Sequence, residues 1–492
     1  MAMEPAQGFI DSVGVVTHFR YTDEAYSESG RLLQSLSRLG VRHIRDGAPA
    51  RPKAPLVAIF KDAFSRGIKL NLVVGSAGQS KVLPSGQEAL AVVNSMNIRD
   101  GVESLEPANE WDLRGGPTWR EQVGQFQQQF FTAVRADPIW NGVPVLGPSV
   151  GRRQRVGDLV GLSAYIDIAN LHNYAAGGPP EDNLSAELAV ARANAPGKPL
   201  FVTEVGYHTA TSQTDRQRPV SEQAKADYLV RTLLENYRAG VARTFIYQLV
   251  DGKPDPSLVD QERHFGLLRN DFSETPAYTE VRNLLTAANT APSTEIGSTA
   301  DKIKVVTADP DVQSLQLDRA DGSSVVVVWR RGAITRGAVD LSRPPIPLEI
   351  STGGGGRKLG VWSGSKLQAV GAGGGVRGDL GEAPLVLDVG SPAGNADSIL
   401  SLGTPPSSAG EISGGQQSTS ATAPVDGSGI DGGYIAGGAV AVFVLGGLTT
   451  GFMLIRRRRG EQGREIDNRR APDPGDDGKN VSSESPEPRP RR

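Results

Sequence analysis

Cysteine is absent from this chain of 492 residues, and only five histidines occur. The absence of cysteine excludes disulfide scaffolds, thiol catalysis, zinc–thiolate sites and cysteine-ligated iron–sulfur clusters, but it does not define a compartment. Neither sign of charge dominates, since 52 Lys and Arg stand against 55 Asp and Glu. This balance argues against a nucleic-acid-binding protein. No HExxH spacing occurs, and we predict neither a metal site nor a cofactor.

Changes of composition divide the chain into segments of different character. With 38% hydrophobic residues, most of it can bury a core, so wholesale disorder is excluded. The predicted segments are a (β/α)8 barrel (TIM barrel) at 1–290, a small antiparallel β-sandwich at 296–390, a flexible Gly/Ser-rich linker at 391–433, one C-terminal transmembrane helix at 434–455 and a disordered tail at 456–492.

The distribution of charged residues predicts the membrane helix. No charged residue occurs from Gly432 to Ile455, and four arginines follow directly at 456–459. A helix of this length covers a hydrocarbon core of about 30 Å. By the positive-inside rule, the tail lies in the cytoplasm and everything before Gly432 lies outside the cell membrane. The alternative is a buried soluble helix.

An exported domain needs an export signal, and the first eight residues have neither a basic start nor an apolar core. We therefore expect the native N-terminus to lie upstream of Met1. If the native chain starts at Met1 without a leader, a tail-anchored cytosolic protein is the better interpretation.

Short β-rich runs alternate with helical spacing between residues 8 and 290. Eight strand–helix units require parallel pairing through helical crossovers and favour a closed (β/α)8 barrel. The alternative is an open doubly wound sheet, but no glycine-rich phosphate turn follows the first strand. The predicted strands lie at 13–18, 41–45, 68–74, 102–106, 143–146, 168–172, 200–204 and 244–249.

Local signals define several of the predicted helices. Four leucines between 32 and 39 mark one helical face, and Gly40 follows as a typical helix end. Ser85 and Glu88 predict a capping box, and Thr118 and Glu121 predict a second one. Later helices are expected near 156–166, 183–194, 221–238 and 276–287.

Polar residues at the predicted strand ends form the candidate site, because carboxyl ends of barrel strands meet around one opening. Glu110 ends the fourth strand and Glu204 the seventh, so the two carboxylates should face each other. Such a pair suits cleavage of a glycosidic bond, in which one carboxyl protonates the leaving oxygen and the other attacks or stabilises the sugar carbon. Arg45, at the end of the second strand, would keep Glu204 ionised.

Each of these signals has an ordinary structural explanation as well. Glutamates at strand ends are usually just solvated, and His172 and Tyr174 could be packing residues. Arg45 could simply pair with Asp46. Their order along the chain is more specific than any one of them, with arginine on strand two, Asn-Glu on four, His-x-Tyr on six and glutamate on seven.

That order resembles the retaining glycoside hydrolases of clan A, the "4/7" barrels, and is similar to families 39 and 5 in particular. The resemblance covers residues 8–290 and implies an O-glycosidase that acts by double displacement on an oligo- or polysaccharide of the cell envelope or the extracellular space. It further implies Glu110 as acid/base, Glu204 as nucleophile, Asn109 as the partner of the sugar 2-hydroxyl, and Arg45, His172 and Tyr174 as residues that orient nucleophile and substrate.

One departure concerns sugar stacking. Many clan members carry a tryptophan at the end of strand eight, where this chain has Tyr247. Tyr247 is therefore expected to serve as the stacking platform, or the pocket is shaped for a different sugar. Trp111, next to the proposed acid, is a second platform candidate, and a core position is the alternative for it.

Two rival functions keep the barrel. A non-catalytic glycan-binding or scaffold protein would be favoured if either glutamate were missing. An aldolase or isomerase needs a strand-end lysine, a phosphate loop or a metal, and Lys69, the only lysine within a predicted strand, lies away from the strand end. In the predicted sandwich few aromatic residues are available, Trp329 and Trp362, so support of the barrel is favoured over a sugar-binding module.

Overall fold

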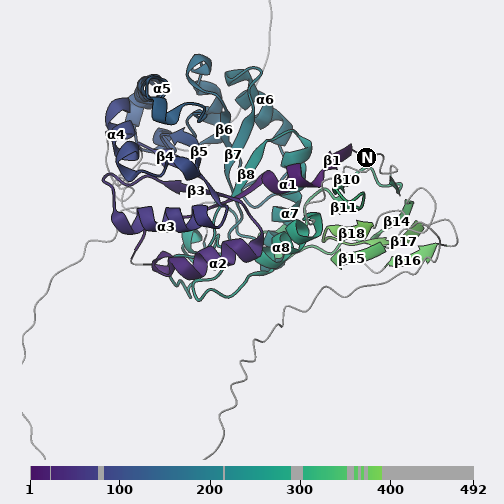
Figure 1. Cartoon of the computed structure of the whole chain (residues 1–492). Coiled ribbons are helices and arrows are strands. Elements are labelled where there is room, and N and C mark those ends of the chain that lie inside the picture. Colours follow the sequence, from purple (N-terminus) through teal and green to yellow (C-terminus); the bar gives the residue numbers. More distant parts are fainter. Residues whose placement is uncertain are drawn as a thin grey trace, which may run out of the picture. The chain divides into compact units, whose positions relative to one another are not determined.

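Parallel strands and helices alternate from Val13 to Ala288 in the computed structural model, and the strands form one curled sheet (Figure 1). Among the described residues, seven strands lie in the order β5-β4-β3-β2-β8-β7-β6. Their bounds are β2 (Val13–Val16), β3 (His43–Gly47), β4 (Lys69–Val74), β5 (Val102–Pro107), β6 (Ala169–His172), β7 (Leu200–Val205) and β8 (Arg243–Ile246). The structure describes residues 2–22, 24–75, 82–213, 217–289, 303–351, 359–363, 367–370 and 375–389.

The segment around Leu146 joins the two edges of this sheet. The amide of Leu146 donates to the carbonyl of Leu105 on β5 at 2.8 Å, and Leu146 forms a parallel bridge with Ile168, next to β6. The strands therefore close into a ring. The strand expected at 143–146 is reduced to isolated bridges. Pro144 interrupts it, because proline has no amide hydrogen to donate to a neighbouring strand.

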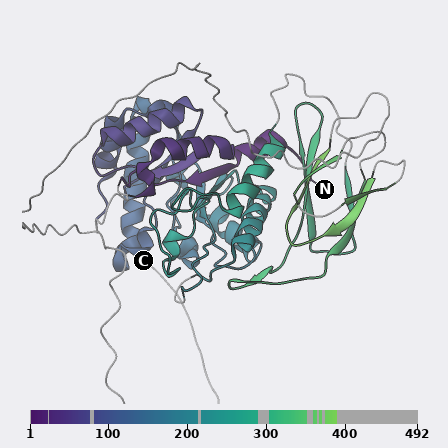
Figure 2. The ribbon, with the colours of Figure 1, turned by 90° about the horizontal axis from the view of Figure 1, so that it is seen from below.

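Helices surround this ring of strands (Figure 2). The predicted leucine face of α2 is confirmed, since none of the four leucines between 32 and 39 is more than 1% exposed. Gly40 ends that helix with a φ of 86°, a left-handed conformation that glycine adopts without strain. The helices are α1 (Ala6–Asp11), α2 (Ser29–Leu39), α3 (Ala54–Ser65), α4 (Gly86–Met96), α5 (Trp119–Ala136), α6 (Leu184–Asn194), α7 (Glu222–Arg238) and α8 (Pro276–Ala288).

Of the two predicted capping boxes, one is present. Ser85 and Glu88 form both reciprocal bonds at the start of α4. Thr118 does not cap α5, because it ends a 3₁₀ turn instead of being extended. Its hydroxyl accepts a hydrogen bond from the Gln122 side chain at 2.8 Å. The same four-residue pattern therefore has different outcomes, depending on the backbone that precedes it.

The helix predicted at 156–166 is also wrong. Two short 3₁₀ segments occupy this region, Arg153–Asp158 and Ser163–Tyr165. Gly161 lies between them with a φ of 81°, which no right-handed helix contains. The turn at Gly161 therefore divides the predicted helix into two short segments.

Strands after residue 303, together with one strand from the N-terminus, form two sheets that pack face to face. One sheet has the order β1-β10-β11-β18-β15 and the other β16-β17-β14-β9, and a core cluster contains side chains from both. A separate pair, β12 and β13, forms a small hairpin. The bounds are β1 (Ala2–Pro5), β9 (Lys304–Val306), β10 (Val312–Asp318), β11 (Ser324–Arg330), β12 (Thr335–Arg336), β13 (Val339–Asp340), β14 (Ile346–Ser351), β15 (Leu359–Ser363), β16 (Leu367–Val370), β17 (Gly375–Leu380) and β18 (Leu385–Val389).

β1 differs from the expected segment boundaries. The sequence predicts a barrel over residues 1–290, yet β1 pairs in parallel with β10 of the sandwich. Its four residues, Ala2–Pro5, carry no pattern that identifies a partner. They are held because β10 offers an unpaired edge, which only the folded second domain provides.

The continuous apolar run of β11 is explained by two different neighbours. Val326 and Val328 point into the core between the two sheets, whereas Val325, Val327 and Trp329 belong to the large cluster that includes the barrel helices. Since side chains alternate along a strand, both faces of β11 are covered. This accounts for a strand that lacks the usual apolar–polar alternation.

A buried carboxylate on α7 links the sandwich to the barrel. Glu235 is 3% exposed and accepts hydrogen bonds from the Trp329 indole at 2.8 Å and from Arg331 Nε at 2.7 Å. For Glu235, burial alone would raise the pKa, but the hydrogen bonds from Arg331 and Trp329 outweigh it and hold the pKa below its usual value. Removing either partner would leave a buried charge without compensation.

Among the described residues, no helix combines the length and apolar character needed to span a bilayer. The predicted span at 434–455, the linker at 391–433 and the tail at 456–492 lie outside the described residues.

Asp227, on α7, makes the fold sensitive to pH. It is 3% exposed, and burial raises its pKa to about 7 against the opposing hydrogen bond from Gln223. A carboxyl with a raised folded pKa stabilises the fold fully below its unfolded pKa of about 3.9 and loses this contribution as the pH rises through 7.

We predict that Asp227→Asn stabilises the protein above pH 7. The neutral amide keeps an acceptor for Gln223 but has no charge to bury. At pH 8 the gain in the free energy of unfolding should be on the order of 2 kcal/mol. This gain should shrink toward pH 5. Thermal unfolding of both proteins between pH 5 and 8 measures this, and a difference that does not vary with pH would contradict it.

Candidate active site

Charged side chains from several strands converge at the carboxyl end of the barrel. Arg45 lies on β3, Glu106 on β5, His172 on β6 and Glu204 on β7. Each of these four residues is at most 7% exposed. Glu110 follows β5 and completes the group. Residues distant in the chain meet here because the strand ends surround one axis.

The Arg45 guanidinium is the centre of the group. Its Nε and Nη2 atoms donate to the two oxygens of Glu106 at 2.8 and 2.7 Å, and its Nη1 donates to Glu204 Oε1 at 2.6 Å. Nη2 also donates to Asn109 Oδ1 at 2.6 Å. The alternative pairing with Asp46 is not made. Asp46 accepts from the backbone amides of residues 19 and 47 and from the hydroxyl of residue 17.

Glu204 receives donors on both carboxylate oxygens. Arg45 occupies Oε1, and the Tyr174 hydroxyl donates to Oε2 at 2.9 Å. Burial and then the negative charge of Glu204 raise the pKa of Tyr174 well above its usual value, so the phenol keeps its proton and remains a donor. A guanidinium and a phenol therefore hold both oxygens of this carboxylate in place.

Glu110 has a different environment. Its backbone is left-handed, with a φ of 47°, and its amide donates to the carbonyl of Ser149 at 3.2 Å. The side chain is 24% exposed, against 10% for Glu204. Its Oε1 lies 2.8 Å from Nδ1 of His172. Glu110 is therefore the carboxylate of this pair that is more open to solvent.

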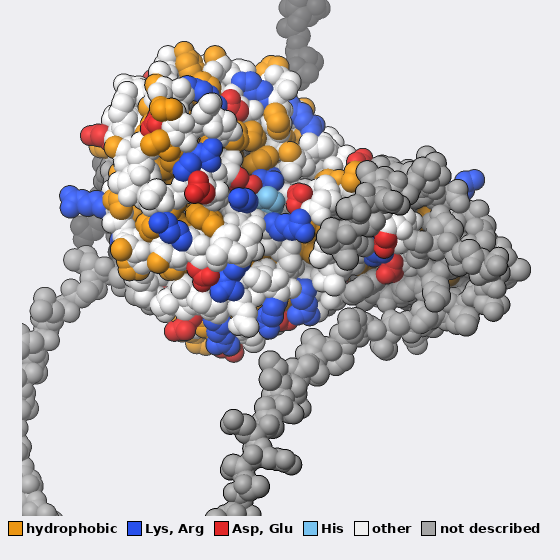
Figure 3. All heavy atoms as spheres, viewed as in Figure 1, with side chains coloured by type: hydrophobic (Ala, Val, Ile, Leu, Met, Phe, Trp, Pro, Cys, Tyr) orange, Lys and Arg blue, Asp and Glu red, His pale blue; other side chains and the backbone are white. Residues whose placement is uncertain are grey.

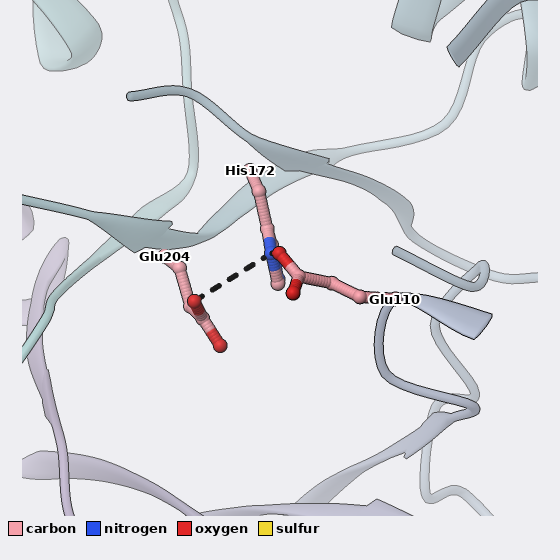
Figure 4. Close-up of side chains that lie close together, drawn as sticks. All are labelled: Glu110, His172 and Glu204. Carbon is pink, nitrogen blue, oxygen red and sulfur yellow. Dashed lines mark hydrogen bonds and ion pairs between the residues drawn. The ribbon is translucent and has the colours of Figure 1, made fainter. Parts of the chain in front are cut away.

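His172 lies between the two glutamates (Figure 4). Its Nδ1 is 2.8 Å from Glu110 and 3.6 Å from Glu204, and its Nε2 is 3.1 Å from the hydroxyl of Thr203. Burial by itself would lower the pKa of His172, but the charge of Glu204 and the hydrogen bond to Glu110 outweigh it and raise the pKa. The imidazole is thus inclined to carry a proton shared with the carboxylates.

One oxygen from each glutamate and one His172 nitrogen lie within 4.8 Å of one another. The same spacing would allow these three groups to hold a metal ion. Their surroundings fit this poorly, because the permanent charge of Arg45 lies 2.6 Å from Glu204 and would repel a cation. The arrangement instead suits two carboxylates that act on one bond.

Figure 3 shows one face of the molecule, on which Lys or Arg, Asp or Glu and a histidine gather over the barrel strands. Charges of both signs therefore surround this region. No single sign of charge dominates this part of the surface.

Known structures resemble this fold. They include a family 39 glycoside hydrolase of Bacteroides cellulosilyticus WH2 (TM-score 0.53, 16% identity, 78% of this chain and 81% of that one) and the family 39 enzyme of Xanthomonas axonopodis pv. citri (0.55, 15%, 79% and 95%). A monomeric β-xylosidase of Caulobacter crescentus CB15 is similar to the same degree (0.53, 15%, 78% and 97%). No protein-family model matches the chain, and no curated protein matches it significantly in sequence. The fold is that of the clan A glycoside hydrolases.

Within this clan A fold, Trp111 is not a sugar platform. It is 1% exposed, and its indole nitrogen donates to Gln122 on α5 at 2.5 Å. The predicted stacking role is therefore corrected to a core role. Trp111 turns inward because the loop after β5 continues as a 3₁₀ turn at Trp111–Leu113 that packs on α5.

Tyr247 remains a candidate wall of the site. It is partly exposed, and its hydroxyl donates to Glu262 at 3.0 Å. Its ring lies 5.3 Å from Phe265, 5.6 Å from His18 and 6.3 Å from Tyr174 between centroids. These neighbours hold the ring at the barrel opening. Neither His18 nor Phe265 is expected at the site from the sequence, although His18 is the last residue of the first predicted strand.

His43 lies at the other end of the barrel. It begins β3, and its Nδ1 is 2.9 Å from Glu103 at the start of β5. Arg243 donates to the same glutamate at 2.6 Å. This second polar group stabilises the amino ends of the strands and is separate from the candidate site.

Three buried residues of the site were missed by the sequence analysis. Glu106 is fully buried and accepts from Asn71 at 2.7 Å and from Thr203 at 3.2 Å as well as from Arg45. One sequence signal could have identified Glu106, Asn71 and Thr203. All three lie inside predicted strands, where polar residues are unusual. Glu106 also shares the inward face of β5 with Ser104, two positions away.

Proposed function

We propose that this protein is a retaining O-glycoside hydrolase that cleaves oligo- or polysaccharides by double displacement. The observation that carries the proposal is the approach of Glu110 and Glu204 to within 4.8 Å at the barrel opening. Retaining enzymes hold their two carboxyl groups about 5–5.5 Å apart, whereas inverting enzymes leave room for a water between them.

In the first step Glu204 attacks the anomeric carbon as nucleophile. The glycosidic bond breaks, and Glu110 donates its proton to the leaving oxygen, which departs as an alcohol. A glycosyl ester of Glu204 remains. The contact of Arg45 with Glu204 at 2.6 Å supports this role, because it orients the nucleophile and places a positive charge beside it.

In the second step Glu110 acts as base. It takes a proton from a water molecule, whose oxygen attacks the anomeric carbon and releases Glu204. The greater exposure of Glu110 supports this assignment, since the acid/base must exchange protons with water. His172, 2.8 Å from Glu110, would hold that carboxyl and share its proton.

Other residues would bind the sugar. Asn109 next to the acid/base would bond the 2-hydroxyl, and Tyr174 would orient the nucleophile through its 2.9 Å hydrogen bond. Tyr247 would form the wall against which the ring packs. No cofactor or metal takes part in this scheme.

We predict that Glu204→Gln abolishes turnover of an activated aryl glycoside. Loss of the nucleophile should lower kcat/KM by about 10⁴-fold or more, with thermal stability kept. Glu121→Gln, an exposed glutamate on α5, is the matched control and should leave kcat/KM unchanged. If Glu204→Gln keeps activity, the nucleophile assignment fails.

For Glu110→Ala we expect a loss that depends on the leaving group. A poor leaving group needs protonation, so its hydrolysis should slow far more than that of a nitrophenolate, and azide should partly restore the latter. Steady-state kinetics on both substrates tests this. Equal losses on the two would count against Glu110 as acid/base.

The rival proposal is a glycan-binding or scaffold protein without catalysis. It predicts that the full-length protein binds glycans but turns over no aryl glycoside, and that Glu204→Gln changes neither property. Screening neutral and acidic aryl glycosides together with envelope polysaccharides separates the two proposals, and NMR of the first-formed anomer tests retention.

From the sequence we also propose that residues 434–455 anchor the protein in the cell membrane, with the barrel outside and the tail in the cytoplasm. The four arginines at 456–459 support this orientation. We expect the full-length chain to resist carbonate extraction from membranes and a chain ending at residue 392 to be released. Release of both would overturn the proposal.

A further inference from the structure

Glu106 is the most deeply buried carboxylate of the site and cannot meet a substrate. It is 0% exposed, and Arg45 lies between it and Glu204. For Glu106, burial alone would raise the pKa, but the charge and hydrogen bonds of Arg45 hold the pKa below its usual value. A charged group is thus kept in the barrel interior without touching the reacting atoms.

The geometry of the Arg45 fork shows what Glu106 can do. A guanidinium is planar, and two parallel hydrogen bonds along one edge fix its rotation. Glu106 forms that pair with Nε and Nη2, which leaves Nη1 directed at Glu204. Asn71 on β4 and Thr203 on β7 in turn hold the oxygens of Glu106 at 2.7 and 3.2 Å.

The negative charge of Glu106 has a second effect, because it reduces the electrostatic stabilisation that Arg45 gives to Glu204. One positive guanidinium serves two carboxylates, so each carboxylate receives less stabilisation than it would alone. The other titratable groups that face Glu204 are His172 and Tyr174 from β6 and the loop after it, Glu110 after β5, and Tyr247 after β8. Besides Arg45, His172 is the charged group that acts on Glu106.

We propose that Glu106 is a positioning residue of the site, which orients Arg45 toward Glu204 and limits the positive charge that Arg45 presents to it. The inference rests on the proposed function, in which Glu204 is the nucleophile. A nucleophile beside an unshared guanidinium would stay ionised to lower pH, but it would also be a weaker base and a poorer nucleophile.

The test is the pH dependence of kcat/KM for Glu106→Gln in the full-length protein. Without the charge of Glu106, the ionisation of Glu204 should move to lower pH, and the acid limb should shift down by about one pH unit. The plateau of kcat should fall about tenfold. If the substitution only disturbed packing, it would lower the plateau of kcat without moving the acid limb of the pH profile.

The same strand offers a matched control. Glu103 also pairs with an arginine, Arg243, and with His43, but at the amino end of the barrel. Glu103→Gln should reduce stability and leave the acid limb in place. If Glu106→Gln leaves the limb in place as well, and loses no more activity than Glu103→Gln, the proposal is overturned.

Glu106→Asp separates orientation from charge. The shorter carboxylate keeps its charge but cannot make both bonds to Arg45, so kcat should fall while the acid limb stays. If Glu106→Gln does not fold, Glu106→Asp decides: a lower kcat at an unchanged melting temperature supports the proposal, and an unchanged kcat overturns it.

A readout independent of turnover distinguishes this inference from the proposed function. The Glu204 carboxyl can be titrated by ¹³C NMR in the full-length protein, and its signal can be assigned by its loss in Glu204→Gln. Glu106→Gln should move that titration to lower pH even if no substrate is found. A titration that stays in place would overturn the inference, whereas absence of turnover alone would count only against the proposed function.

Discussion

The buried guanidinium of Arg45 is the interaction on which the rest of the site depends. It holds two carboxylates, Glu106 and Glu204, in the interior of the barrel, where a charge without a partner would cost several kcal/mol. Three strands, β3, β5 and β7, are thereby connected at their carboxyl ends. The polar interior is tolerated because nearly every buried oxygen of the group has a donor.

Around this ion pair, the two candidate catalytic carboxylates have unequal environments. Glu204 is anchored by Arg45 and Tyr174 and is nearly enclosed, whereas Glu110 is more exposed and contacts His172. Chemistry at a glycosidic bond requires one carboxyl that stays charged and one that exchanges protons. The difference arises from neighbours on other strands, since both residues are the same amino acid.

The second domain is connected to the barrel by buried polar and apolar contacts. β11 is covered on both faces, and Trp329 and Arg331 satisfy the buried charge of Glu235 on α7. α7 follows β7, the strand that carries Glu204. The sandwich therefore contacts the helix that follows the strand from which the candidate nucleophile projects.

Sequence by itself was sufficient for features that repeat along the chain or occur at strand ends: the alternation of strands and helices, the leucine face of α2, and the positions of Glu110, His172 and Glu204. Local patterns encode these directly, because period and strand termini are properties of short segments. Only the tertiary structure decided that β1 pairs with β10, that Trp111 turns into the core, and that Glu106 shares Arg45 with Glu204. Those outcomes depend on which surfaces meet across the barrel. Local sequence patterns do not encode contacts between residues that are distant in the chain, because only the closed ring of strands brings these residues together.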